Sequence, residues 1–320
     1  MRAHAVAQPN IALVKYWGKR DAERNLPAAS SLSLTLDTLW TRMSVELLDA
    51  TEADTLWVNG SPNAAMLERV SRCLDQVLEP GRPKATVVSE SNFPIGAGLA
   101  SSSSAFAALV MATNKAARLS RDTLSLARLA GASSGSAARS FYEGIVVLSA
   151  GEREIDVRSI AAAQEWPLCI VIAITESGPK SVGSTEAMLR SAATSPFYRS
   201  WLEGQDTDLR LAEAAVRERD FEKLGEVSEH NCLKMHAVMW TSRPSVGYWN
   251  TATLNAMETV RELKRSGVPV FFTIDAGPQV KAVCLPAACE AVRLALSATE
   301  GVMQVLVSGL GSGARLLDRV

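Results

Sequence analysis

A segment rich in glycine and serine carries the first candidate chemistry of this chain. Residues 94–104 read P-I-G-A-G-L-A-S-S-S-S and lead directly into an apolar stretch of small residues. Small residues let a backbone approach a ligand closely, and the unpaired N–H groups at the start of a helix attract anions. Serine hydroxyls can bind phosphate oxygens or a metal ion, but serine is also a common helix cap. The residues alone therefore leave open a phosphate cradle or a serine-rich cap.

A second segment gathers positive charge within a few residues. Residues 10–21 read N-I-A-L-V-K-Y-W-G-K-R-D, so Lys15, Tyr16, Lys19 and Arg20 lie beside an apolar run. This group could form a cationic pocket for a small anionic ligand. The alternative is that Lys15 is a solvated charge at the end of a strand.

A third segment combines small residues with one guanidinium group. Residues 131–140 read G-A-S-S-G-S-A-A-R-S and end with Arg139 and a serine. The planar fork of an arginine suits a carboxylate, which it binds through two parallel hydrogen bonds. An ordinary helix N-terminus with a surface arginine would have the same composition.

A single acid, Asp275, follows an apolar run and precedes a sharp turn, in the sequence I-D-A-G-P. We expect this carboxylate to be rigid and partly desolvated, which would raise its pKa and suit it to general base chemistry. An Asx-type turn is the alternative. His230, Cys232 and His236 also have metal-ligating side chains, but no second ligand cluster accompanies them, and we expect no zinc site there.

The elements that must position these residues follow from hydrophobic periodicity. Strands are expected at residues 11–16, 31–36, 43–47, 86–91, 144–149, 168–175, 268–274 and 303–307. Helices are expected at residues 64–78, from 106 onward, and at 208–216, 221–239, 245–266 and 279–299. The alternation at residues 31–36 predicts a half-buried strand. Clustered strands with intervening helices indicate an α+β fold. A Gly/Pro/Ser segment near residue 180 divides the chain into expected domains of residues 1–180 and 181–320.

Composition excludes several classes of protein. The chain has 320 residues, with 33 Lys+Arg against 34 Asp+Glu and a net charge of −1. This balance argues against nucleic-acid binding and against a polybasic membrane surface. No apolar run approaches the ~18 to 20 residues of a membrane span, and no signal peptide is recognised, so we expect a cytoplasmic protein. The five cysteines are widely spread without a C-x-x-C pair, which predicts reduced thiols.

Taken together, the motifs resemble a known family. The pattern P-x-G-x-G-L-x-S-S-S resembles the phosphate loop of the GHMP superfamily of small-molecule kinases. The K-Y-W-G-K-R-D stretch is similar to the N-terminal signature of the mevalonate diphosphate decarboxylases, which belong to that superfamily. The G-S-A-A-R-S and D-A-G-P stretches resemble further motifs of the same family, and residues 180–188 match a fifth one weakly.

The resemblance implies a fold and a reaction. The expected fold is the two-domain α+β GHMP kinase fold, with an N-terminal domain like ribosomal protein S5 domain 2 and a ferredoxin-like C-terminal domain. The expected active site lies in the cleft between them, and a homodimer is expected. The implied reaction is the ATP- and Mg²⁺-dependent decarboxylation of mevalonate 5-diphosphate to isopentenyl diphosphate, through phosphorylation of the 3-hydroxyl group.

The resemblance also implies a role for individual residues. Asp275 would deprotonate the 3-hydroxyl, Lys15 would hold Asp275 ionised, and Arg139 would bind the substrate carboxylate. The other expected substrate-binding residues are Tyr16, Lys19, Ser134, Ser136 and Ser184. ATP would be held by Gly96, Gly98, Leu99, Ala100, Ser101, Ser102 and Ser103, with Ser102 as a ligand of the metal ion.

Four departures from the family pattern are Ala29, Gly183, Ala187 and Gln279. They lie outside the acid–base set but affect how phosphates and nucleotide would be held. Three alternatives therefore stay open: a decarboxylase of the monophosphate, a mevalonate 3-kinase, or a catalytically inactive nucleotide-binding relative.

Overall fold

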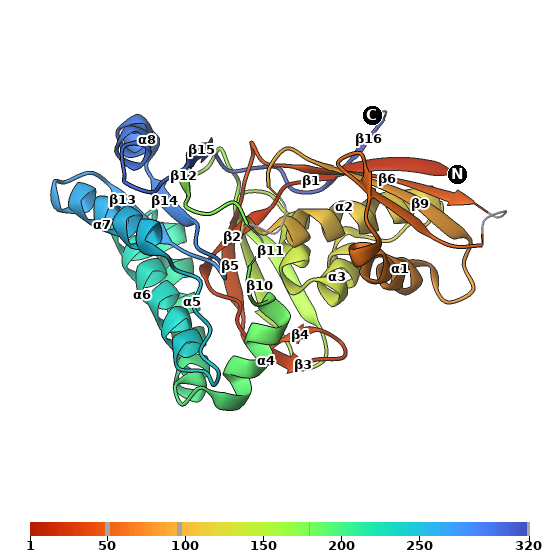
Figure 1. The fold of residues 1–320 in the computed structure, drawn as a ribbon, viewed down its shortest axis with the longest axis horizontal. Helices are drawn as coiled ribbons and strands as arrows, with labels where there is room; N and C mark the ends of the chain where they lie inside the picture. Colours follow the sequence, from red (N-terminus) through yellow and green to blue (C-terminus); the bar gives the residue numbers. More distant parts are fainter. Residues whose placement is uncertain (49–51, 95–97, 179, 319–320) are drawn as a thin grey trace.

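The computed structural model describes residues 1–48, 52–94, 98–178 and 180–318. Helices α5 to α8 and the strands packed on them form one side of the molecule, while β1, β6, β9 and helices α1 to α3 form the other (Figure 1). Strands and helices are clustered rather than regularly alternating, which confirms the predicted α+β class.

The largest sheet has the strand order β16-β1-β6-β9-β7-β8. All of its pairings are antiparallel except that of β7 with β9. Its strands are β1 (Arg2–Ala7), β6 (Thr41–Leu48), β7 (Thr55–Val58), β8 (Ser61–Pro62), β9 (Lys84–Ser91) and β16 (Arg315–Leu317). Helices α1 (Ala64–Leu78), α2 (Ser101–Ala116) and α3 (Thr123–Ser133) share an apolar core with this sheet. Alanines at the centre of α2 are fully buried, because only small side chains let the helix approach the sheet so closely.

A second sheet, β11-β10-β5-β2, crosses the middle of the molecule (Figure 1). Its strands are β2 (Asn10–Val14), β5 (Ser31–Thr35), β10 (Ile145–Ala150) and β11 (Ile155–Ala161), and a short hairpin of β3 (Lys19–Asp21) and β4 (Leu26–Pro27) lies after β2. The prediction of a half-buried strand at residues 31–36 is wrong, since all five residues of β5 are buried. The leucines enter an apolar core, and the hydroxyl of Ser31 accepts a hydrogen bond from Arg139.

The third sheet, β13-β14-β12-β15, packs against the C-terminal helices. Its strands are β12 (Cys169–Ile174), β13 (Val270–Thr273), β14 (Val280–Cys284) and β15 (Gln304–Ser308). The helices are α4 (Ser184–Thr194), α5 (Tyr198–Glu218), α6 (Phe221–Trp240), α7 (Thr251–Arg265) and α8 (Cys289–Ser297), and two short 3₁₀ helices are η1 (Gly135–Phe141) and η2 (Pro286–Ala288). Among the helices that the structure describes, none has both the length and the apolar character of a membrane span.

Two predictions in this region are wrong. The helix expected over residues 279–299 is instead strand β14, the 3₁₀ helix η2 and the shorter helix α8. All five residues of β14 are buried, because the strand lies between β13 and β12 and its apolar side chains enter two different core clusters. The cysteines are not all reduced either: Cys169, which begins β12, forms a disulfide with Cys289, which begins α8. A pairing across 120 residues leaves no signal in the local spacing.

Candidate active site

A cavity of about 910 Å³ brings the predicted motifs together. Its walls come from the end of β2, the start of α2, the η1 loop, the start of α4 and the turn after β13. Lys15, Arg139 and Asp275 all line it, although they lie far apart in the sequence. The four segments with candidate chemistry therefore form one site.

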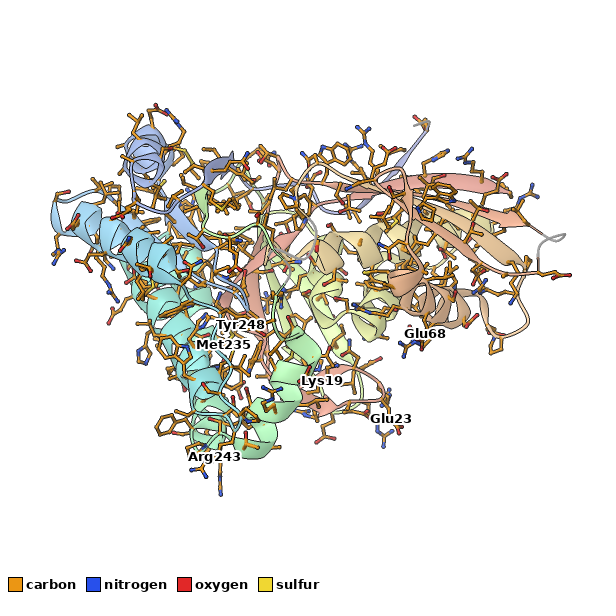
Figure 2. The ribbon with its side chains drawn as sticks, viewed as in Figure 1. Lys19, Glu23, Glu68, Met235, Arg243 and Tyr248 are labelled. Atoms are coloured by element: carbon orange, nitrogen blue, oxygen red, sulfur yellow. A yellow bond between two sulfur atoms is a disulfide. The ribbon has the colours of Figure 1, made fainter. Side chains whose placement is uncertain are left out.

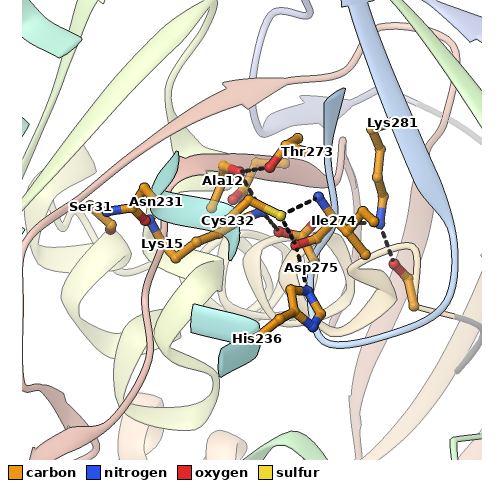
Figure 3. Close-up of polar contacts among 12 residues, drawn as sticks. Ala12, Lys15, Ser31, Asn231, Cys232, His236, Thr273, Ile274, Asp275 and Lys281 are labelled. Atoms are coloured by element: carbon orange, nitrogen blue, oxygen red, sulfur yellow. Dashed lines mark hydrogen bonds and ion pairs between the residues drawn. The ribbon is translucent and has the colours of Figure 1, made fainter. Parts of the chain in front are cut away.

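Asp275 lies on the turn that leaves strand β13, and two lysines approach its carboxylate from different elements. The Nζ atom of Lys15 donates to Oδ1 of Asp275 at 2.8 Å and also to the carbonyl oxygen of Ala12 at 2.8 Å. The Nζ atom of Lys281, on β14, lies 3.5 Å from Oδ2. Both lysines are buried, whereas 21% of the Asp275 side chain is exposed to the cavity (Figure 3).

The expectation that the pKa of Asp275 is raised is wrong. Burial does oppose ionisation, but Lys15, Lys281 and Arg139 together outweigh it and hold the pKa of this carboxyl well below its usual range. Asp275 is therefore ionised over the whole physiological pH range, and it faces the cavity as a hydrogen-bond acceptor.

Helix α6 fixes the backbone on both sides of this ion pair. The Oδ1 atom of Asn231 accepts from the backbone N–H of Lys15 at 2.8 Å. Cys232 Sγ accepts from the N–H of Ile274 at 3.2 Å, and His236 Nε2 lies 3.2 Å from the carbonyl oxygen of Ile274. Burial lowers the pKa of His236 to about 3, so it is neutral at physiological pH. The Cys232 and His236 side chains thus contact the backbone next to Asp275, a positioning role that the sequence did not indicate (Figure 3).

Arg139 is held rigidly on η1 at the floor of the cavity. Its Nε atom donates to Oδ1 of Asn10 at 3.0 Å, and Nη1 donates to the hydroxyl of Ser31 at 2.7 Å. Asn10 is itself fixed, because its amide donates to the hydroxyl of Ser140 at 2.8 Å. Burial lowers the pKa of Arg139 to about 10, which leaves the guanidinium charged.

The predicted substrate-binding residues surround the same space. Tyr16, Lys19, Ser134, Ser136 and Ser184 all line the cavity. The hydroxyl of Tyr16 is buried without a hydrogen-bond partner among the described residues, and burial raises its pKa to about 12. Lys19 begins the β3–β4 hairpin (Figure 2), and its pKa is lowered by burial and by nearby Arg69.

A lysine absent from the predicted set, Lys180, also lines the cavity. Its Nζ atom donates to the hydroxyl of Ser184 at 2.9 Å. Burial and the charge of Lys281 lower its pKa to about 8. Lys180 therefore adds to the positive charge around Asp275.

The glycine-rich segment reaches the cavity only in part. Gly98, Ala100, Ser101 and Ser102 line it. Leu99 is buried in an apolar core cluster. Ser103 is not a lining residue, and its hydroxyl donates to the carbonyl oxygen of Ala100. Gly96 lies outside the described residues.

The start of α2 fits a polyphosphate. Ala100, which precedes the helix, has a left-handed conformation and provides no side-chain cap, and the first turn holds no acidic residue. The N-terminus of α2, with its partial positive charge and no side-chain cap, therefore suits an anion. The hydroxyl of Ser102 lies at the cavity and accepts from that of Ser134 at 3.2 Å. Among the described residues that line the cavity, the acids are Asp275 and Glu23. With so few acidic ligands, the cavity suits a Mg²⁺ ion that is coordinated mainly by phosphate oxygens and by few protein side chains.

A helix N-terminus that shares a cavity with an ionised carboxylate and several cationic side chains is typical of an enzyme that transfers phosphoryl groups between small molecules. Comparison with known proteins makes this class specific. Residues 7–161 match the model of the diphosphomevalonate decarboxylase-like N-terminal domain, and residues 170–306 match the mevalonate 5-diphosphate decarboxylase C-terminal domain. The chain belongs to the diphosphomevalonate decarboxylase family.

Individual relatives agree with this assignment. The chain is 37% identical to diphosphomevalonate decarboxylase mvd1 of Aspergillus fumigatus over 87% of its own length and 75% of that protein. The solved complex of MDDEF with MVAPP, AMPPCP and magnesium has a TM-score of 0.94 at 35% identity, and covers 100% of this chain and 99% of that one. Mevalonate diphosphate decarboxylase from Staphylococcus aureus has a TM-score of 0.93 at 34% identity, with 99% and 98% covered. The predicted two-domain GHMP kinase fold is thereby confirmed.

Proposed function

We propose that this protein catalyses the ATP-dependent decarboxylation of mevalonate 5-diphosphate, which yields isopentenyl diphosphate, carbon dioxide, ADP and phosphate. The observation that carries the proposal is the ionised Asp275, held by Lys15 and Lys281 in the same cavity as the start of α2 and the Arg139 guanidinium. The solved complex of the relative MDDEF contains MVAPP, AMPPCP and magnesium, which supports the same ligands here.

The chemistry explains why these groups are needed. The 3-hydroxyl is on a tertiary carbon and leaves poorly, but its phosphate ester leaves well. When phosphate departs, positive charge develops at C3, and the carboxylate two bonds away loses carbon dioxide to form the alkene. The driving force comes from the phosphate, so no separate electron sink is required.

In this proposal, Asp275 accepts the hydrogen bond of the 3-hydroxyl and orients its oxygen for attack on the γ-phosphorus of ATP. Its low pKa makes it mainly an orienting group, which takes the proton as the O–P bond forms. Lys15 holds Asp275 in place and stabilises its charge. Arg139 binds the substrate carboxylate until that group leaves as carbon dioxide.

The remaining cavity residues bind the two phosphorylated ligands. Tyr16, Lys19, Ser134, Ser136 and Ser184 contact mevalonate 5-diphosphate, for which the unpartnered Tyr16 hydroxyl is a suitable donor. Gly98, Ala100 and Ser101 and the first N–H groups of α2 hold the phosphates of ATP. Ser102 provides a hydroxyl ligand for Mg²⁺, which when bound neutralises charge on the transferring phosphates.

Two further properties are part of the proposal. We expect the protein to be cytoplasmic and to form a homodimer, as the family resemblance implies. Light scattering coupled to size-exclusion chromatography measures the second property directly, and a mass of one chain would contradict it.

The test of the proposed function is a comparison of three acids. Purified protein is incubated with ATP, Mg²⁺ and either mevalonate, its 5-phosphate or its 5-diphosphate, and ADP and carbon dioxide are both measured. We expect both products in equal amounts, with the highest kcat/KM for the diphosphate. ADP without carbon dioxide would indicate a 3-kinase, a preference for the 5-phosphate would indicate the monophosphate decarboxylase, and neither product would contradict the proposal.

A matched pair of variants identifies the site. Asp275→Asn keeps the size of the side chain and should reduce kcat by about 10³-fold or more. Asp206→Asn makes the same change on the exposed face of α5 and should leave turnover unchanged. Near-normal turnover in folded Asp275→Asn would contradict the role of this carboxylate.

A further inference from the structure

Lys281 is a buried lysine that contacts two parts of the site at once without lining the cavity itself. It is the second residue of strand β14 and has no exposed surface. Its Nζ atom donates to the carbonyl oxygen of Gly98 at 3.0 Å and lies 3.5 Å from Oδ2 of Asp275. One ammonium group therefore joins the glycine-rich loop to the carboxylate (Figure 3).

Packing alone does not favour a lysine at this position, because burying a charged ammonium group is unfavourable. Its neighbours along the strand, Val280 and Ala282, are apolar and fully buried. A buried ammonium loses its hydration, and an apolar side chain of similar volume commonly replaces a buried ion pair without loss of stability. The stability of the sheet therefore does not account for the charge of Lys281.

The loop and the turn that carries Asp275 also touch directly. A Cβ atom added to Gly277 would lie 2.9 Å from the Cα atom of Gly98, which is closer than real Cβ contacts allow. Gly98 has a φ of +81°, a backbone conformation that glycine adopts easily. The two backbones are thus in contact, with Lys281 directly beside this contact.

We infer that Lys281 is a positioning residue that sets the separation between the ATP phosphates and the oxygen to be phosphorylated. It does so by holding the Gly98 carbonyl of the phosphate loop and one oxygen of Asp275 with the same ammonium group. This inference rests on the proposed function, because it assigns ATP to the loop and the 3-hydroxyl to Asp275.

Other charged and titratable groups face the same carboxylate and limit what the loss of Lys281 can do. These groups are Lys15 directly after β2, Arg139 on η1, Lys180 in the loop before α4, and Cys232 and His236 on α6. Because three of these groups are cations, Asp275 stays ionised at neutral pH without Lys281. The acidic limb of the pH profile should nevertheless move to higher pH, since one of the charges that lower the pKa of Asp275 is gone.

The test compares Lys281→Met with Lys115→Met, which removes an exposed lysine at the end of α2. Binding of Mg²⁺–AMPPCP is measured by calorimetry, and KM for both substrates and the pH dependence of kcat/KM by steady-state kinetics. For Lys281→Met we expect binding of the ATP analogue to weaken about tenfold, as for the loss of a hydrogen bond from a charged donor. KM for ATP should rise in parallel, and KM for mevalonate 5-diphosphate should change less than about twofold. Lys115→Met should behave as wild type.

Thermal unfolding of each variant establishes that it is folded. If Lys281→Met does not fold, Lys281→Gln replaces it, since the amide removes the charge and keeps a donor. Analogue affinity within about twofold of wild type in the folded variant, with an unchanged acidic limb, would overturn the inference. Failure of the proposed function looks different: wild type would bind Mg²⁺–AMPPCP without turning over any mevalonate derivative, and the affinity comparison would still decide the role of Lys281.

Discussion

Replacing Lys15 with methionine removes the ammonium group that donates directly to the Asp275 carboxylate. Two unit charges 2.8 Å apart attract each other by about 6 kcal/mol at an effective dielectric constant of about 20. Breaking a buried pair by removing one partner costs about 3–5 kcal/mol. Asp275 keeps some exposure and a second ammonium at 3.5 Å, so we expect Lys15→Met to lose about 2–3 kcal/mol of unfolding free energy.

The backbone contributes little to this cost. The carbonyl oxygen of Ala12, which accepts from Lys15, also accepts from the hydroxyl of Thr273 at 3.2 Å and so keeps a partner in the variant. The effect on catalysis should be larger, because Asp275 loses both its orientation and part of its charge stabilisation. We expect kcat/KM to fall by about 10² to 10³ at neutral pH.

Two assays separate these effects. Urea unfolding measures stability, and the ADP formed in quenched samples between pH 3 and 8 measures kcat/KM. Protonated Asp275 cannot accept the hydroxyl hydrogen bond, and without Lys15 its pKa rises toward the ordinary value, so the acidic limb should move to higher pH. Arg82→Met is the matched control: it breaks a buried pair, Arg82–Asp54 at 2.7 Å, outside the cavity lining.

The control should lose stability without any change in pH profile. The reasoning would be refuted if folded Lys15→Met kept kcat/KM within about threefold of wild type with an unshifted acidic limb. A shift of the limb in Arg82→Met would refute it equally, because loss of stability alone would then explain both variants.

Three other predictions concern the same structure. Gly135→Ala would place a Cβ atom 2.5 Å from the Tyr16 hydroxyl, so the tyrosine ring must move. KM for mevalonate 5-diphosphate should then rise by up to about 10²-fold with little change in KM for ATP. An unchanged KM for mevalonate 5-diphosphate would mean that Tyr16 does not bind this substrate. Unfolded, unreduced protein should expose three free thiols to a thiol reagent, and five after reduction, because Cys169 and Cys289 are joined; five thiols before reduction would exclude the disulfide. Because the pKa of Asp275 is depressed, its ionised form stabilises the folded protein fully at pH values above the ordinary pKa of 3.8, and this contribution is lost as the pH falls below that value. In Asp275→Asn the unfolding free energy should therefore depend less on pH in the acidic range.

The sequence predicted the helix at residues 64–78 and several residues of the site. The helix at residues 64–78 has the predicted bounds, because it has a regular apolar face and begins directly after the capping Asn63. The motifs around Lys15, Arg139 and Asp275 identified residues that line the cavity because all of them match motifs of one family, whereas each motif alone left a structural alternative open.

Contacts between residues far apart in the sequence could not be predicted from these patterns. Lys281 lies in a run that was assigned to a helix, although a single lysine among buried residues was itself a signal of a paired charge. The direction of the Asp275 pKa shift depends on Lys15, Lys281 and Arg139, whose charges come close to this carboxyl only in the folded chain. The contact of Asn231 with Lys15, and those of Cys232 and His236 with Ile274, likewise depend on how α6 packs, which no spacing along the helix reveals.

The pairing of β16 with β1 has a consequence for synthesis on the ribosome. Strand β1 is synthesised before all the other described elements that pair with it, and β16, which covers one of its edges, is the last of them to be made. Until then the N-terminal sheet presents unpaired N–H and C=O groups, the usual starting point of edge-to-edge aggregation. We therefore expect removal of residues 315–318, or a bulky fusion placed directly after them, to lower the yield of folded protein even though this segment lies on the opposite side of the molecule from α5 and α6 (Figure 1).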